Sequence, residues 1–462
     1  MNKLSTATLV TAFAASLLGT GCANGKHGIS CDPNAPNTIC TIAGDGQALL
    51  AGDNGPATKA SLYTPQDSVI APNGNLWVLD FNNYLIREID PKGTISTVVG
   101  VGFLGDSPDV GVPSCPALDA KFNHTPNMFF DADGSLYLAA WHNSRINRVE
   151  LSTMTYTHFA GVGKRTKYSG DEGPAADAYL DLPSSIARAP SGDLVIMDQA
   201  NQVIRSIDSA GIIHRLAGTC LTEQYDTVST MCTMGTELYQ CPGSNKATYC
   251  TDPTSPEAAQ AKRDEACNWP CTPGYSGDGG PALSARMNQP FGQSADPAGR
   301  FAFNKQGELI FADTGGNRIR KIDVNGNMQT VAGSGGENAY SGDGGPATKA
   351  QLAHPIDLAI ADDDTIYFTD TLNNCIRKID PSGTISRVAG DCTTGGMCGG
   401  TGSCFSTDGT AGCVKATDVC FGGDGGDPLL ARLNRPYGVE LSGKKLYITD
   451  SYNQRVRVVN LP

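Results

Sequence analysis

Five polar side chains that could do chemistry stand beside a proline that recurs before short apolar runs: Asp67, His354, Asp357, Arg435 and Tyr437. Two carboxylates and a histidine could hold calcium or another cation, or act as acid and base. Such groups also serve simply to solvate the mouth of a channel. Both interpretations stay open at this stage, and the sequence assigns no catalytic residue.

Motifs that would name an enzyme class are absent from the sequence. No P-loop, nucleophile elbow or glycine-rich dinucleotide turn leads from an apolar run into a helical pattern. The acidic runs 131–134 and 362–364 look superficially like calcium loops, but both fall where a hairpin turn is expected. An enzyme is therefore not favoured, and we expect no cofactor, with Ca²⁺ or Zn²⁺ left open.

An eleven-residue pattern recurs six times and defines the elements that must position these side chains. It begins at the following residues: Asp80, Ala140, Asp198, Asp313, Asp370 and Asp450. Each copy follows a short β-type run, which is itself preceded by a proline and another apolar run. After five copies comes a fourth run that ends in glycine. Four short strands joined by turn residues are typical of a propeller blade, and the recurring Asp and Asn suit local bonds across the turn.

The sixth repeat lacks its fourth strand, because only three residues follow Val459. The segment 38–44 near the N-terminus matches 384–390 almost position for position. We therefore predict that the N-terminal strand completes the last blade, which removes the exposed edges of an open array. The predicted fold is an all-β, six-bladed propeller over residues 37–462.

The connector 340–347, Tyr-Ser-Gly-Asp-Gly-Gly-Pro-Ala, leads into the strand pair that ends at Asp370 and continues as Asn373-Asn374-Cys375-Ile376-Arg377. This pattern resembles the bacterial NHL repeat. The resemblance covers about 37–462 and is weaker in the second repeat, where Ala140 replaces Asp. NHL propellers include extracellular receptor-type domains, RNA-binding domains and a lyase, so the resemblance implies the fold and leaves the function open.

The propeller interpretation places the first strand of each blade at the central channel. We expect the second residue after each proline to form a ring there: Asp67, Met128, Ser185, Gly292, Asp357 and Gly438. The NHL propellers that this sequence resembles include amidating lyases, which carry zinc on histidines from several blades. Here His124 stands two residues before its proline and His354 one residue before, so we expect them out of register. A three-histidine zinc site is therefore not favoured.

Two long inserts, 219–274 and 391–421, interrupt the connectors before the fourth and sixth blades. They and the neighbouring strand contain these disulfide candidates: Cys220, Cys232, Cys241, Cys250, Cys267, Cys271, Cys375, Cys392, Cys398, Cys404, Cys413 and Cys420. The spacings lack the paired CxxC of zinc knuckles and favour disulfides in an exported chain. Because five cysteines fall in the second insert, Cys375 is the nearest outside partner. Both inserts should rise on the face of the turns after strand two, for recognition or as protection against proteases.

Residues 1–21 read as a signal peptide, with Lys3, an apolar stretch and small residues before Cys22. Cys22 resembles the lipidated cysteine of bacterial lipoproteins, although Gly19 departs from the usual pattern, and ordinary cleavage nearby is the alternative. Residues 22–36 would form a tether. We expect an exported protein anchored by lipid to a bacterial membrane (outer membrane or cell surface), or otherwise periplasmic or secreted.

The formal charge of −13 argues against nucleic acid as a partner. The leading interpretation is an extracytoplasmic binding scaffold that presents one propeller face to a protein, peptide or glycan, and that meets the membrane through its lipid anchor alone. The alternative is a propeller-type lyase or lactonase with a cation at the channel mouth.

Overall fold

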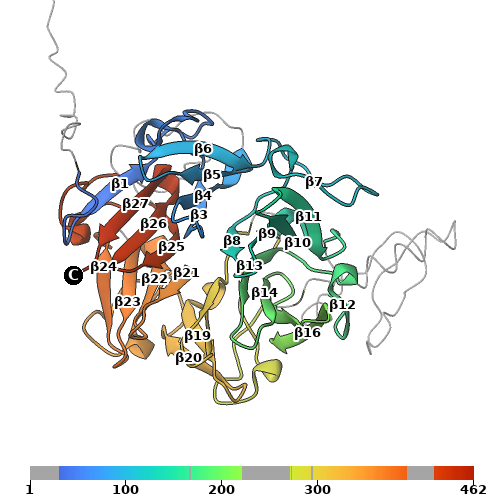
Figure 1. Ribbon diagram of the computed structural model, residues 1–462. Helices are drawn as coiled ribbons and strands as arrows, with labels where there is room; N and C mark the ends of the chain where they lie inside the picture. Colours follow the sequence, from blue (N-terminus) through green and yellow to red (C-terminus); the bar gives the residue numbers. More distant parts are fainter. Residues whose placement is uncertain (1–30, 166–167, 221–270, 272, 293–294, 393–420) are drawn as a thin grey trace, which may run out of the picture. The chain divides into compact units, whose positions relative to one another are not determined.

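Six antiparallel sheets, three of four strands and three of five, organise the described part of the chain in the computed structural model (Figure 1). The structure describes residues 31–462 except 166–167, 221–270, 272, 293–294 and 393–420. The first strands of neighbouring sheets contact one another around a complete circle, from the first blade to the sixth and back to the first. The predicted six-bladed propeller is confirmed.

In blades 1 to 5 the four main strands run in sequence order from the centre outward, and in blade 6 the outermost strand is β1. Blade 1 consists of β3 (Pro65–Ile70), β4 (Leu76–Asp80), β5 (Leu85–Ile89) and β6 (Thr94–Val99). Blade 2 consists of β8 (Asn127–Phe130), β9 (Ser135–Ala140), β10 (Arg145–Glu150) and β11 (Thr155–Ala160). Blade 3 consists of β13 (Pro183–Arg188), β14 (Leu194–Asp198), β15 (Val203–Ile207) and β16 (Ile212–Ala217). Blade 4 consists of β17 (Phe301–Phe303), β18 (Leu309–Asp313), β19 (Arg318–Ile322) and β20 (Met328–Ala332). Blade 5 consists of β21 (Pro355–Ile360), β22 (Ile366–Asp370), β23 (Cys375–Ile379) and β24 (Ile385–Ala389). Blade 6 consists of β25 (Pro436–Ser442), β26 (Lys445–Asp450), β27 (Arg455–Asn460) and β1 (Ile39–Ala43).

Short elements fill the turns and connectors. Two-residue strands extend the first three blades: β2 (Gly55–Pro56), β7 (Cys115–Pro116) and β12 (Gly173–Pro174). Single turns of 3₁₀ helix follow the second strand: η2 (Phe81–Asn83), η4 (Trp141–Asn143), η8 (Thr314–Gly316), η10 (Thr371–Asn373) and η12 (Ser451–Asn453). Similar turns lie in the connectors: η1 (Ala57–Lys59), η3 (Ala117–Asp119), η5 (Ala175–Asp177), η7 (Ala282–Ser284), η9 (Ala347–Lys349) and η11 (Pro428–Leu430).

The N-terminal strand β1 closes the ring beside β27 (Figure 1). The two strands are antiparallel, with Ile39 opposite Val459 and Ala43 opposite Val456. A disulfide joins Cys31 to Cys40 in this strand. The predicted completion of the last blade by the N-terminal segment is confirmed.

A fully buried arginine in the third strand organises five of the six blades. In blade 5, Arg377 donates to Asp370 Oδ2 at 3.2 Å and to Asp343 Oδ1 of the preceding connector at 2.7 Å. Asp370 also accepts from Asn373 Nδ2 at 2.9 Å and from the backbone N–H of Ala353 at 2.7 Å. The equivalent arginines are Arg87, Arg205, Arg320 and Arg457. The recurring Asp and Asn therefore serve the fold, as expected.

Blade 2 replaces this charged group by neutral side chains. Ala140 stands where the other blades have Asp, and Asn147 stands where they have Arg. The Oδ1 of Asn147 lies 2.9 Å from His158 Nδ1, and His158 Nε2 lies 3.3 Å from the carbonyl oxygen of Pro108. A carboxylate and its arginine are thus lost together in this blade, so neither charge is left buried alone.

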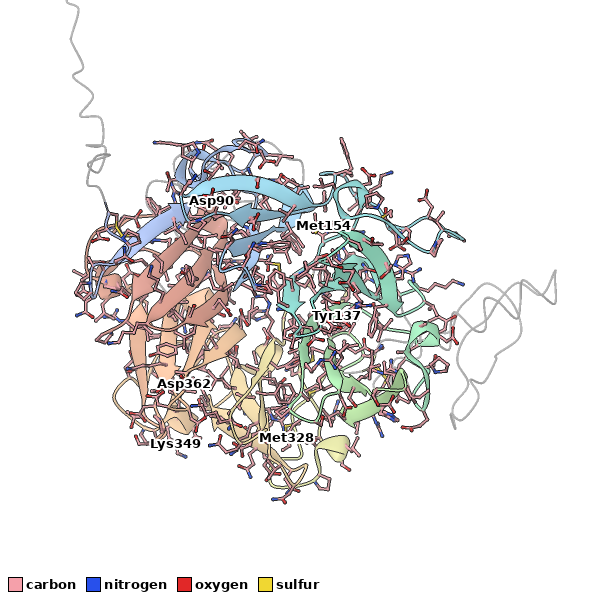
Figure 2. All side chains as sticks on the ribbon, in the orientation of Figure 1. Asp90, Tyr137, Met154, Met328, Lys349 and Asp362 are labelled. Carbon is pink, nitrogen blue, oxygen red and sulfur yellow. A yellow bond between two sulfur atoms is a disulfide. The ribbon has the colours of Figure 1, made fainter. Side chains whose placement is uncertain are left out.

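The hydrophobic core is divided into seams between neighbouring blades. In each seam, alternate residues of one second strand pack against the next blade, as Trp77 and Leu79 pack against Leu136 and Leu138. Tyr137 has the same role between blades 2 and 3 (Figure 2). The alternation follows from the pleat of a strand, which sends successive side chains to opposite faces.

Two further disulfides lie beside the inserts, one at the two ends of the first and one at the start of the second. Cys220 bonds to Cys271, with Cα atoms 4.7 Å apart, and Cys375 bonds to Cys392. Cys375 is the first residue of β23, two residues after the end of η10, so the disulfide holds Cys392, at the start of the second insert, beside the turn after strand two. Cys115 is the free cysteine among the described residues. The remaining candidates lie outside the described residues: Cys232, Cys241, Cys250, Cys267, Cys398, Cys404, Cys413 and Cys420.

The predicted signal peptide 1–21, Cys22 and most of the predicted tether also lie outside the described residues. Within the described ranges, no helix combines the length and apolar character needed to cross a membrane.

Removing residues 37–44 should destabilise the whole propeller, because blade 6 loses its outer strand and the ring its closure. We expect a clear fall in the midpoint of thermal unfolding, measured by circular dichroism. Removal of residues 23–30, which leaves Cys31 and Cys40 in place, is the control. A 37–44 deletion that melts with the full-length protein would refute the closing role of β1.

Replacing Arg377 by Met should lower the free energy of unfolding by about 3–5 kcal/mol, because Asp370 stays buried without its charged partner. Urea unfolding measures the loss. The matched control is the double variant Asp370→Ala with Arg377→Asn, which copies the pair found in blade 2. It should recover most of the stability. A double variant as unstable as Arg377→Met would show that packing, and not charge, explains the arginine.

Candidate functional site

The innermost ring of side chains is set by strand pairing and not by the prolines. In blades 1 to 5 it is formed by the residue thirteen positions before the end of strand two: Asp67, Asn127, Ser185, Arg300 and Asp357. Gly438, opposite Thr449, completes the ring in blade 6. The expectation was wrong for blade 2, where Asn127 replaces Met128, and for blade 4, where Arg300 replaces Gly292. Blade 4 carries eight extra residues after Pro290, and blade 2 has its proline one position later.

Arg300 fills the centre of this ring with a guanidinium group that is 1% exposed. Its Nη1 lies 2.9 Å from Asp357 Oδ2 and 3.6 Å from Asp67 Oδ1. Its Nη2 donates to the carbonyl oxygens of Gln66, at 2.9 Å, and Pro126, at 2.5 Å. One side chain from blade 4 thus reaches blades 1, 2 and 5.

Both carboxylates of the ring are occupied by protein donors. Asp67 Oδ2 accepts from Asn127 Nδ2 and the N–H of Met128, each at 3.0 Å, and Oδ1 accepts from its neighbour in the strand. Asp357 Oδ2 accepts from the N–H of Val439 at 3.0 Å, and Oδ1 also accepts a backbone N–H. Burial raises the pKa of Asp67 to about 6, although Arg300 opposes the shift. The cation between these two carboxylates is the protein's own arginine.

Glu440 lies in β25, two residues after the ring residue Gly438. Burial, with the charges of Asp67 and Asp357 adding to it, raises the pKa of Glu440 to about 8. The carboxyl group of Glu440 therefore holds a proton at neutral pH.

A second group of predicted residues meets at the mouth, above the ring. Tyr437 donates through its hydroxyl to Asp296 Oδ1 at 2.8 Å and stacks on Tyr452 with ring centroids 6.1 Å apart. Arg435 Nη1 lies 3.3 Å from Tyr452 Oη, with the guanidinium 4.9 Å from the ring centroid. His354 feels the charges of Asp296 and Arg435, but burial dominates and lowers its pKa. The five predicted residues thus separate into a buried ring pair, Asp67 and Asp357, and three residues at the mouth. These three, with Asp296 and Tyr452, are called the mouth group below.

The mouth group is held in place by the segment inserted into blade 4. Gln199 Nε2 donates to the carbonyl oxygens of Pro290, at 2.8 Å, and Asp296, at 2.9 Å. Its Oε1 accepts from the N–H of Ala298 at 3.0 Å and from Trp141 Nε1 at 3.1 Å.

Asp296 and Tyr452 were missed by sequence reasoning. Counting back thirteen residues from Asp313 finds Arg300 and shows that the preceding residues are an insertion.

The histidines His124 and His354 are in register, contrary to the expectation. Each stands sixteen residues before the end of strand two and has a positive φ, 52° for His124 and 56° for His354. His124 lies against His142, with their Nδ1 atoms 3.1 Å apart. Burial lowers the pKa of His124 to about 4 and that of His142 to about 3, so both are neutral at pH 7. Among the described side chains, no cluster of three or more His, Cys, Asp or Glu could hold a metal ion.

The sequence is similar to one region of much longer characterised proteins. Teneurin-1 of Mus musculus is 24% identical over 389 residues, which are 74% of this chain and 13% of the relative. Teneurin-3 of Mus musculus is 35% identical over 393 residues, again 74% of this chain and 13% of the relative. The chain therefore spans about 13% of the length of these relatives. No protein-family model matches the sequence.

Solved structures share the propeller fold at low sequence identity. A protein of unknown function from Bacteroides thetaiotaomicron has a TM-score of 0.53 at 13% identity, over 91% of this chain and 75% of that chain. An auxiliary nutrient binding protein from the same organism has a TM-score of 0.52 at 14% identity, over the same shares. At these identities the similarity shows the fold alone.

Replacing Glu440 by Gln should change the pH dependence of stability. The folded pKa of about 8 lies above the ordinary glutamate value of 4.5, so the folded state binds more protons between these two pH values. The native protein therefore loses stability as pH rises through this window, and the variant loses less. Urea unfolding at pH 4.5, 6.5 and 8.5 should show a difference that widens towards alkaline pH. A constant difference would contradict the raised pKa.

Proposed function

We propose that the protein is an extracytoplasmic binding scaffold that holds a protein, peptide or glycan at the channel mouth. The observation that carries the proposal is the mouth group, defined as His354, Arg435, Tyr437, Tyr452 and Asp296. Tyrosine and arginine side chains on a rigid support are the residues that dominate binding energy at protein surfaces. Arg300 closes the channel beneath them, so a ligand would rest on this face.

The two inserts support the same choice of face. The disulfide Cys220–Cys271 joins the two ends of the first insert, and Cys375–Cys392 joins the start of the second insert to β23. Loops on a rigid scaffold often carry recognition. The B. thetaiotaomicron neighbour described as a nutrient binding protein shares the fold, and binding by this chain is our proposal.

We also propose that the protein works outside the cytoplasm, anchored through a lipid on Cys22 after removal of residues 1–21. Three disulfides among the described cysteines support an oxidising compartment. The NHL-type connector and the apolar segment before Cys22 favour a bacterial lipoprotein of this repeat class. Globomycin treatment and the variant Cys22→Ser, followed by detergent partition, test the anchor. Unchanged partition of Cys22→Ser into the detergent phase would refute it.

Replacing Tyr452 by Ala should weaken partner binding at least tenfold, because Tyr452 provides ring surface to the mouth without lining the buried ring. The partner is first identified by crosslinking in its native cell envelope, and the affinity of the purified pair is then measured by calorimetry. Asp362→Asn, in an exposed turn at the other strand ends (Figure 2), is the matched control and should bind normally. Equal affinities for both variants would move the binding surface away from the mouth.

Excising residues 221–270 tests the first insert. The Cα atoms of Cys220 and Cys271 lie 4.7 Å apart, so a short Gly–Ser linker can join the ends with little strain on the sheet. The excised protein should unfold within a few degrees of the native protein, because long surface loops add little closure entropy. Its affinity for the partner should fall strongly. An excised protein that folds and binds normally would leave the insert with a protective role.

A further inference from the structure

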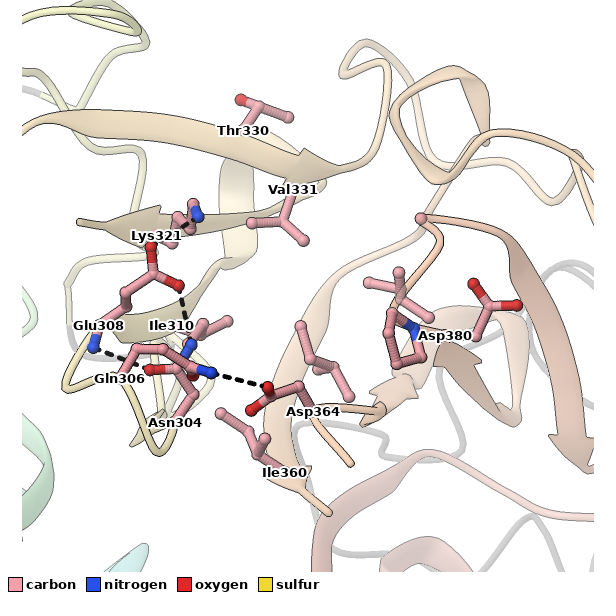
Figure 3. Close-up of a pocket in the computed structure, with 14 residues that line it drawn as sticks. Asn304, Gln306, Glu308, Ile310, Lys321, Thr330, Val331, Ile360, Asp364 and Asp380 are labelled. Carbon is pink, nitrogen blue, oxygen red and sulfur yellow. Dashed lines mark hydrogen bonds and ion pairs between the residues drawn. The ribbon is translucent and has the colours of Figure 1, made fainter. Parts of the chain in front are cut away.

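A groove lies between blades 4 and 5, at the strand ends opposite the turns after strand two (Figure 3). It is bounded by the first hairpin of each blade and by the turn that follows Ile379. Its volume is about 390 Å³. This volume is within the range of sites for small molecules.

The groove exists because this seam lacks a large side chain that the other seams have. The residue three positions before the end of strand two faces the next blade, and in chain order it is Trp77, Tyr137, Val195, Ile310, Tyr367 and Tyr447. Behind Val195 the seam is filled by Phe301 and Phe303 of blade 4. At Ile310 the facing residues of blade 5 are Ile360 and Ile366. Aliphatic groups on both sides leave the space open.

The floor and the rim of the groove differ in character. The floor is aliphatic and is formed by these residues: Ile310, Val331, Ile360, Ile366 and Ile379. At the rim, Lys321 Nζ lies 2.7 Å from Glu308 Oε1, so these two charges compensate each other. Asp364 and Asp380 line the rim without a salt bridge among the described residues. The groove therefore carries a net negative charge over an apolar floor.

Asp364 is held at the rim against the preference of its backbone. Its φ is +66°, and the same hairpin position in blades 1 to 4 is glycine, with φ between 82° and 97°. This left-handed region is unfavourable for a residue that has a side chain. Gln306 Nε2 donates to Asp364 Oδ2 at 3.0 Å across the seam, whereas Oδ1 is buried and has no hydrogen-bond partner (Figure 3). Among the described residues, the Asp364 carboxylate is thus paired with a neutral amide and with no cation.

We propose that this groove binds a small aliphatic primary amine, with its hydrocarbon chain on the isoleucine floor and its ammonium group at the carboxylate of Asp364. An anion would meet two carboxylates, and a polyol would leave its hydroxyl groups unpaired on the apolar floor. An ammonium group compensates the charge of the Asp364 carboxylate and donates to it. The site is separate from the channel mouth and extends the proposed function.

The test is a calorimetric and NMR titration of the full protein with pentylamine. Pentylamine should bind, and pentanoate at the same concentration should not. Asp364→Gly, which restores the glycine of the other hairpins, should weaken binding at least tenfold. Ile310→Tyr, which copies blades 2, 5 and 6, should fill the groove and abolish binding. Asp362→Asn in the same hairpin and Tyr452→Ala at the mouth are the controls and should bind pentylamine normally.

Asp364→Asn keeps the shape of the side chain and serves if the glycine variant folds poorly. Two results would overturn the proposal: pentanoate that binds as tightly as pentylamine, or Asp364 variants that bind pentylamine with unchanged affinity. A blocked lysine, Nα-acetyl-lysine methylamide, that binds more than tenfold tighter than pentylamine would assign the groove to a peptide partner and overturn the small-molecule assignment.

Discussion

The buried arginine of the third strand is the interaction on which the blades depend. A guanidinium group has five donors in a fixed plane and cannot lose its charge at ordinary pH. In blade 5, Arg377 donates to Asp370 at the end of strand two and to Asp343 of the connector. It also donates to two carbonyl oxygens of the connector. One side chain thus joins parts of the blade that are far apart in sequence. Its burial is tolerated because partners surround it.

The same chemistry recurs at the centre of the ring, where Arg300 stands between two aspartates from different blades. There it joins blades to one another and not the parts of a single blade. Its role also explains why the two aspartates are structural, although carboxylates near a channel suggest a metal site. Polar groups that remain available for binding lie above this layer, at the mouth, where Tyr452 and Arg435 are partly exposed.

Much of the fold could be predicted from the sequence, because the repeated pattern marks the second and third strands and its missing last strand reappears at the N-terminus. The register of the first strands could not be read from the prolines. Pro126 is displaced by one position, and Pro290 is followed by an insertion. The site was therefore only partly predictable. Arg435 and Tyr437 flank the proline that begins β25, whereas Asp296 lies in a segment that has no counterpart in other blades and Arg300 follows that segment.

The pairing of β1 with β27 joins residues about 420 positions apart, since Ile39 lies opposite Val459. Contacts so distant in sequence form late, because the chain between them must first become ordered. Blades 1 to 5 can assemble one after another as the chain emerges, but the sixth must wait for its two ends to meet. Until then, β1 and the open flank of β27 both present unpaired backbone groups, which are prone to association with other chains. Assembly of this protein is thus most vulnerable just before its last strand is in place.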